Sequence, residues 1–176
     1  DPPRFLVGDV PAVGTGPRRR TAARDESPSP LARLIRRVDW RWDDEGHRDR
    51  WSHLFVIETH RGARPRQVTA GDWGVSDIAW APDDRTVAFS ADRGPEPDLR
   101  PRSTIWAVDV DGGSTRDGDG RAPEPREVMA AEGFAGHPAY SPDGRWLAAI
   151  GVLEAEPLDD SSPTVLLGPA DGSAAP

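Results

Sequence analysis

The chain has 176 residues, a formal net charge of −8 at pH 7 and a predicted pI near 5.0. Such an acidic balance argues against nucleic acid as a partner, because nucleic-acid-binding proteins carry a basic face. The absence of cysteine excludes disulfides, thiolate metal sites and a cysteine nucleophile.

Glycine and proline together favour turns between short strands over long helices, since the chain has 18 Gly and 19 Pro. No apolar run approaches the length of a membrane-spanning helix, and no signal peptide is visible. We expect no membrane partner and a cytoplasmic protein; a periplasmic location is also compatible with a chain that lacks cysteine. The first residue is Asp1 rather than Met, so we also expect a processed chain or a fragment.

The N-terminal segment, residues 1–33, is expected to hold one short strand at Phe5 to Val7 and then a flexible loop. Val10 to Ser29 is rich in Pro, Gly, Arg and Ser and shows little hydrophobic periodicity. The remainder, residues 34–176, contains the pattern that predicts the fold.

An acidic segment, "DDEGH", follows, in which His47 is close in sequence to Asp43, Asp44 and Glu45. Three carboxylates and an imidazole could bind a metal ion, but their spacing matches no standard site, and we interpret them as a solvated turn. Tryptophans flank the turn and favour packing between sheets over a ligand platform; they are Trp40, Trp42 and Trp51.

A repeat with a period of 60 residues dominates the rest of the chain. "IAWAPDDRTVAFS" (78–90) matches "PAYSPDGRWLAAI" (138–150), within hairpin copies at 75–90 and 135–150. The similarity extends to further segments: "SHLFVIET" (52–59) resembles "STIWAVDV" (103–110), "PRQVTA" (65–70) resembles "PREVMA" (125–130), and "PTVLLGPADG" (163–172) begins a third cycle.

One unit of this repeat is predicted to form four strands, at 75–80, 85–90, 104–110 and 126–129. Tight turns at Pro82–Asp83–Asp84 and Pro142–Asp143–Gly144 join the first two strands, because Pro presets φ and Asp bonds forward to the backbone. In the second copy we expect Gly144 to have positive φ.

Recurring units of four antiparallel strands are typical of β-propeller blades, whereas a β-sandwich would make the similarity accidental. The predicted fold class is therefore all-β, a partial β-propeller of about two to three blades. Propellers close with roughly 4–8 blades, so these units form an open arc. Its last unit carries Val165, Leu166 and Leu167 without a polar cap, so we expect the isolated chain to be unstable or to self-associate.

Candidate catalytic and metal-binding residues are interpreted as structural. His53, His60 and His137 fall in strand-like or turn segments, and no serine lies on the strained elbow that nucleophilic catalysis needs. "DVDGGSTRDGDG" (109–120) lacks the glutamate that closes a calcium loop. The sequence thus predicts no catalytic residue, no metal ligand and no cofactor; Ser76, Ser90, Ser141, Trp73, Trp80 and Trp106 are assigned to strands, turns and inter-blade packing.

The motifs "AWAPDDRTVAFSADRG" and "AYSPDGRWLAAIG" resemble the repeat of TolB-like β-propellers, which also forms the N-terminal propeller of prolyl oligopeptidase family serine peptidases. The ordered series over about Leu34 to Asp171 is similar to the acylaminoacyl-peptidase-like members. The resemblance implies that this chain is a non-catalytic propeller that gates access of short peptides to a C-terminal α/β-hydrolase domain. That domain would carry its serine in a G-x-S-x-G motif, which does not occur in these 176 residues. The alternative is a TolB-like scaffold for protein–protein binding with no enzymatic activity.

Overall fold

A computed structural model describes residues 5–9, 38, 41–42, 46–47, 51–111, 123–131, 133–152 and 162–176. Within these ranges every regular element is a β-strand. The strands form three main antiparallel sheets and a separate short pair, β2 (Arg41–Trp42) with β3 (Gly46–His47).

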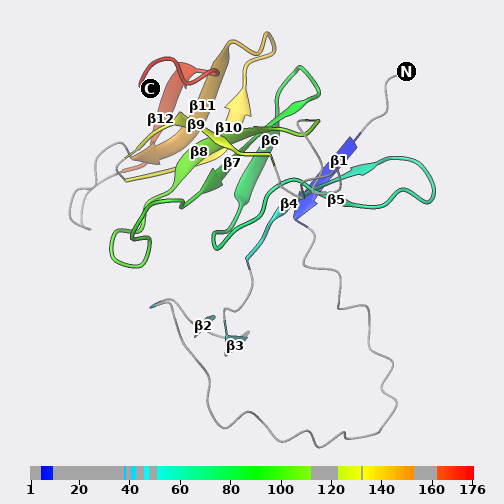
Figure 1. Cartoon of the computed structure of the whole chain (residues 1–176). Helices are drawn as coiled ribbons and strands as arrows, with labels where there is room; N and C mark the ends of the chain where they lie inside the picture. The colour runs from blue at the N-terminus through cyan, green and yellow to red at the C-terminus, as the bar shows by residue number, and fades with distance from the viewer. Residues whose placement is uncertain are drawn as a thin grey trace, which may run out of the picture.

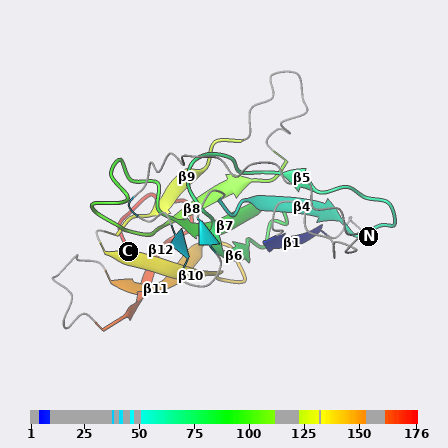
Figure 2. The ribbon, with the colours of Figure 1, turned by 90° about the horizontal axis from the view of Figure 1, so that it is seen from below.

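The central sheet is a complete four-stranded unit, and a three-stranded sheet lies on each side of it (Figures 1 and 2). Within each main sheet the strands lie side by side in the order of the chain. The first sheet contains β1 (Phe5–Asp9), β4 (Leu54–Glu58) and β5 (Arg66–Gln67); the central sheet contains β6 (Ser76–Trp80), β7 (Thr86–Ala91), β8 (Thr104–Asp109) and β9 (Arg126–Met129); the third sheet contains β10 (Phe134–Tyr140), β11 (Trp146–Val152) and β12 (Thr164–Pro169).

The predicted fold class, an all-β open arc of antiparallel blades, is confirmed. The four strands expected from the repeat coincide with β6 to β9 to within one residue at each end. β10, β11 and β12 repeat the first three strands of that unit.

The short strand predicted near the N-terminus is β1, and it pairs with β4 over five residues. It thereby takes the position in the first sheet that β7 has in the central sheet, next to the third strand of the unit. Nothing in the repeat indicated this partner. The loop predicted over Val10 to Ser29 lies outside the described residues, so that expectation stays a prediction.

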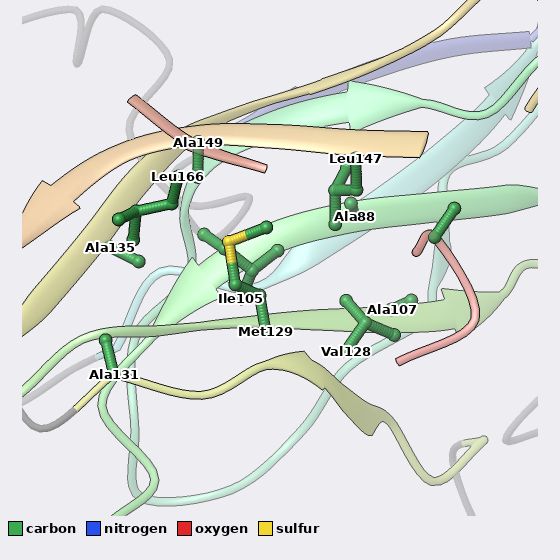
Figure 3. Close-up of a cluster of buried hydrophobic side chains, with 11 residues drawn as sticks. Ala88, Ile105, Ala107, Val128, Met129, Ala131, Ala135, Leu147, Ala149 and Leu166 are labelled. Carbon is green, nitrogen blue, oxygen red and sulfur yellow. The ribbon is translucent and has the colours of Figure 1, made fainter. Parts of the chain in front are cut away.

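Two apolar layers hold the three sheets together, and β7 contributes to both. Its residues alternate in direction, as in any strand, so that Val87 and Phe89 face the first sheet while Ala88 faces the third. The layer between the first and central sheets also contains Leu54, Val56 and Val68. Figure 3 shows the layer between the central and third sheets: Ala88, Ile105, Ala107, Val128, Met129, Ala131, Ala135, Leu147, Ala149 and Leu166.

Aromatic stacking completes the layer between the first and central sheets. The Trp73 ring lies parallel to Phe89, with centroids 5.9 Å apart, and the Arg93 guanidinium sits 4.7 Å from the Trp73 ring centre and 4.3 Å from that of Trp106. Stacked Arg contributes cation–π attraction while its stem covers apolar surface. Trp73, Trp80 and Trp106 all pack against this layer, which confirms their predicted role between blades.

The hairpin turns are held by their aspartates. Asp143 accepts hydrogen bonds from the Ser141 hydroxyl (2.6 Å) and the Arg145 guanidinium (2.7 Å), and these bonds lower the pKa of its carboxyl to about 2. Asp83 accepts hydrogen bonds from the backbone amides of Arg85 and Thr86 and from the Thr86 hydroxyl. The bond from the Arg85 amide has its counterpart in the second turn, where the Arg145 amide donates to Asp143. The last turn residue has positive φ in both copies, 70° at Gly144 and 57° at Asp84.

Truncation of a side chain within the layer should cost far more stability than the same truncation at the surface. Leu147 is fully buried, so Leu147→Ala is expected to lower the free energy of unfolding by about 2–5 kcal/mol. Leu99→Ala is the matched control because Leu99 is 72% exposed, and its cost should be below about 0.5 kcal/mol. Urea titration followed by tryptophan fluorescence measures both; equal costs would contradict the assigned core.

The second hairpin turn should require glycine at residue 144 because of its positive φ, and not because a larger side chain would lack space there. A Cβ at residue 144 would meet Pro82 at 3.7 Å, an ordinary contact, but φ is 70°. Gly144→Ala is therefore expected to destabilise the chain by roughly 1 kcal/mol. Gly74→Ala is the control, since its Cβ would meet Trp51 at 3.5 Å without positive φ. A thermal midpoint that falls equally in both variants would refute the turn argument.

Candidate functional site

The first strands of neighbouring sheets, β6 and β10, lie side by side, and each is interrupted at the same repeat position. The register of β6 with β7 shifts between Ser76 and Ile78, and that of β10 with β11 shifts between Gly136 and Ala139. A bulge of this kind redirects a side chain out of the regular alternation.

The redirected residues are Asp77 and His137, which are separated by one repeat period of 60 residues. Both have positive φ, 43° and 51°, a conformation in which Asp and His are enriched among residues other than glycine. The same local backbone thus recurs in both units and places one polar side chain at the junction of the sheets.

The two side chains meet, with His137 Nδ1 lying 3.3 Å from Asp77 Oδ1. The other carboxylate oxygen of Asp77 accepts a hydrogen bond of 3.1 Å from the Ser90 hydroxyl on β7. Gly136 permits this approach, because a Cβ there would stand 2.8 Å from Asp77 Oδ2. The cluster therefore links β6, β7 and β10 at a point where two sheets meet.

A second contact reinforces the same junction. The Ala135 amide donates a 2.6 Å hydrogen bond to the Ser103 carbonyl, and the Ser103 hydroxyl donates a 3.0 Å bond to the Ala135 carbonyl. Residues just before the His137 bulge are thereby tied to the start of β8.

Serine, histidine and aspartate come together at this junction, but not in the order of a catalytic triad. In a triad the imidazole lies between the hydroxyl and the carboxylate and takes the proton from the hydroxyl. In this cluster the Asp77 carboxylate lies between the two, and Ser90 is buried. The Ser90 hydroxyl therefore has no imidazole to activate it, and the arrangement suits binding or fastening instead of nucleophilic attack.

The other histidines lie in separate environments. His53 is half-buried against the Trp73 ring, edge to face, and burial lowers its pKa in spite of a hydrogen bond with the Gly71 backbone. His60 is in an exposed turn, where hydrogen bonds to the Arg61 carbonyl and the Glu58 carboxylate raise its pKa. Neither shares a site with the Asp77 cluster.

The remaining candidates are structural where they are described. Ser141 is part of its hairpin turn, and Asp109 accepts a 2.8 Å hydrogen bond from the Asp111 amide at the end of β8. Within the described ranges no three histidine, aspartate or glutamate side chains gather into a metal-binding group. The rest of the 109–120 loop, the carboxylates beside His47, and the side chains of His47, Trp40 and Trp42 lie outside the described residues.

The Asp77–His137 pair could not be found by interpreting each residue alone. The signal was present in the repeat, where a polar residue occupies the same position of the first strand in both copies. A contact between equivalent positions of adjacent units follows only when the units are packed side by side.

No family model matches the chain. A relative described as an uncharacterized peptidase, YuxL, of Bacillus subtilis (strain 168) is 28% identical over 140 residues, which cover 64% of this chain and 21% of the relative. A solved structure described as a TolB of Agrobacterium tumefaciens superposes with a TM-score of 0.54 at 21% identity, and covers 73% of this chain and 41% of that one.

These comparisons agree with the resemblance found in the sequence. The solved structure supports the propeller fold, and the relative connects the repeat with a protein named as a peptidase. This chain spans about a fifth of that relative's length. Among the described residues, no helix has the length and apolarity needed to cross a membrane.

Labelling by a fluorophosphonate tests whether Ser90 in the Asp77 cluster can act as a nucleophile. The purified 176-residue chain is expected to remain unlabelled at Ser90. The Ser90 hydroxyl donates a hydrogen bond to the Asp77 carboxylate, and no imidazole is placed to remove its proton. Intact-mass spectrometry after incubation provides the measurement, with chymotrypsin as a positive control. Stoichiometric modification of one serine in this chain would overturn the assignment of the cluster as non-catalytic.

Proposed function

We propose that this chain is the β-propeller portion of a serine peptidase that hydrolyses short peptides, similar to acylaminoacyl- and dipeptidyl-peptidases. Its role is to gate the access of substrate to a C-terminal α/β-hydrolase domain of the parent protein. The observation that carries the proposal is the similarity over 140 residues to a protein described as a peptidase, in a segment that folds as propeller blades.

The Asp77–His137 contact fits such a gating role. β6 and β10 are the first strands of neighbouring sheets and touch one another, so in a ring of blades they would line the inner side. A contact that fastens these two strands would limit how far the blades separate. A cytoplasmic location is part of this proposal, and it is compatible with a chain that has no cysteine and so depends on no disulfide.

The test uses the full-length product of the gene and peptide p-nitroanilides of increasing length. The expected result is that a fluorophosphonate labels a serine outside these 176 residues and that kcat/KM falls as the peptide becomes longer. The double variant Asp77→Ala/His137→Ala should raise kcat/KM for the longer peptides several-fold and leave the shortest unchanged.

Glu58→Ala is the matched control, because it also removes a carboxylate–imidazole contact, with His60, but in an exposed turn of the first sheet. It should leave the length dependence unaltered. Absence of any labelled serine and of any hydrolysis would reject the peptidase proposal and favour a propeller that acts only as a protein-binding scaffold.

A further inference from the structure

Two arginines one repeat period apart connect neighbouring sheets at their last strands. Arg66 is the first residue of β5, in the first sheet, and Arg126 is the first residue of β9, in the central sheet. The Arg66 guanidinium donates a 2.5 Å hydrogen bond to the Val110 carbonyl, which follows β8 of the next sheet. Arg126 Nη1 donates a 2.8 Å bond to the Asp171 carbonyl, which follows β12 of the next sheet. The repeat thus encodes a contact between sheets.

The Arg126 bond and the Asp77–His137 contact join the same two sheets at opposite edges. In the central sheet Arg126 lies on β9 and Asp77 on β6, with the other two strands between them. In the third sheet the Asp171 carbonyl follows β12, and His137 lies on β10 at the other edge. Neighbouring strands are spaced by about 4.8 Å, so roughly 14 Å of sheet separates β6 from β9. Arg126 therefore acts on the Asp77–His137 contact only through the packing of the two sheets.

Glycine permits the close approach of the two sheets at both edges. A Cβ at Gly136 would stand 2.8 Å from Asp77 Oδ2, and a Cβ at Gly172 would stand 3.0 Å from Val128 Cα on β9. Gly172 follows Asp171 directly, so this close seat on β9 keeps the Asp171 carbonyl within reach of the arginine. The apolar layer of Figure 3 lies between the two edges.

Contacts at opposite edges fix the angle between two packed sheets more closely than one contact can. Burial of apolar area is non-directional and tolerates small rotations better than hydrogen bonds do, which need donor–acceptor distances of roughly 2.7–3.2 Å. A rotation that the Arg126 bond prevents would also move β10 relative to β6. The 3.3 Å distance between Asp77 and His137 would change with it.

We propose that Arg126 is a positioning residue for the Asp77–His137 contact. It holds the last strand of the central sheet against the third sheet, and thereby sets the angle at which the carboxylate meets the imidazole on the first strands. Loss of its guanidinium should weaken a contact that it does not touch. This inference stands on the geometry of the two sheets, and only its consequence for peptide hydrolysis rests on the proposed function.

The Ala135 amide reports directly on the junction of the two sheets. It donates its hydrogen bond across the junction to the Ser103 carbonyl, so its exchange with deuterium requires the sheets to separate there. The Ala81 amide is the internal reference, since it donates to the Thr86 carbonyl within the central sheet. Hydrogen–deuterium exchange of the full-length product of the gene, measured by mass spectrometry with electron-transfer fragmentation, compares the two amides.

Arg126→Met is expected to raise the exchange rate of the Ala135 amide about fivefold or more, and to change that of the Ala81 amide by less than about twofold. Arg126→Lys keeps a donor for the same carbonyl and should retain most of the protection. Arg85→Met is the matched control, because Arg85 is also exposed but pairs with two aspartates of its own sheet. It should leave exchange at Ala135 unchanged.

A double-variant cycle tests the coupling between the two edges. Added to Asp77→Ala/His137→Ala, Arg126→Met should raise exchange at Ala135 by less than about twofold further, because the contact that it positions is already absent. Equal rises at Ala135 and Ala81 would indicate a general loss of stability. No rise at Ala135, or an additive rise in the cycle, would show that the edges are independent. Each of these three results would overturn the proposal.

Peptide hydrolysis separates this inference from the proposed function. Arg126→Met should raise kcat/KM for the longest p-nitroanilides several-fold relative to the shortest, whereas Arg85→Met should leave that ratio unaltered. Faster exchange at Ala135 with an unaltered length dependence, or with no hydrolysis at all, would sustain the positioning role of Arg126 and reject the gate.

Discussion

The requirement that both faces of a strand find an apolar neighbour organises this protein. Side chains along β7 alternate, so burying Val87 and Phe89 against the first sheet leaves Ala88 to be covered by the third. A single sheet of this repeat cannot satisfy both of its sides. Stability therefore arises between units, as in repeat proteins generally, and each layer joins residues from two sheets.

The same requirement explains the Asp77–His137 contact. Packing two units side by side brings equivalent positions of their first strands together, and at this position the residues are a carboxylate and an imidazole instead of two apolar groups. A bulge in each strand turns the polar group out of the apolar layer. The junction thus holds a polar contact without burying an unpaired charge.

The local structure could be predicted from sequence because its causes are local. Pro142, Asp143 and Gly144 specify a turn through φ preference and side-chain hydrogen bonding, and alternation in β7 and β11 specifies the faces. The pairing of β1 with β4 was not predictable in this way, since β1 has no counterpart in the visible repeat. The Asp77 cluster also depends on the relative placement of two units, which no single segment encodes.

The pairing of β1 with β4 has a consequence for the order of folding. The 44 residues from 10 to 53 separate these two strands, whereas β6, β7 and β8 are joined by shorter connections. Closing a long loop costs chain entropy before any contact is gained, so hairpins form sooner than distant strand pairs. The central sheet is thus the natural nucleus, and β1 is added last. Until it docks, β4 pairs only with β5 and presents a free edge with which another chain could pair. A cut between residues 10 and 53 would turn the docking of β1 into an association of two separate chains, and would so lengthen the life of that exposed edge.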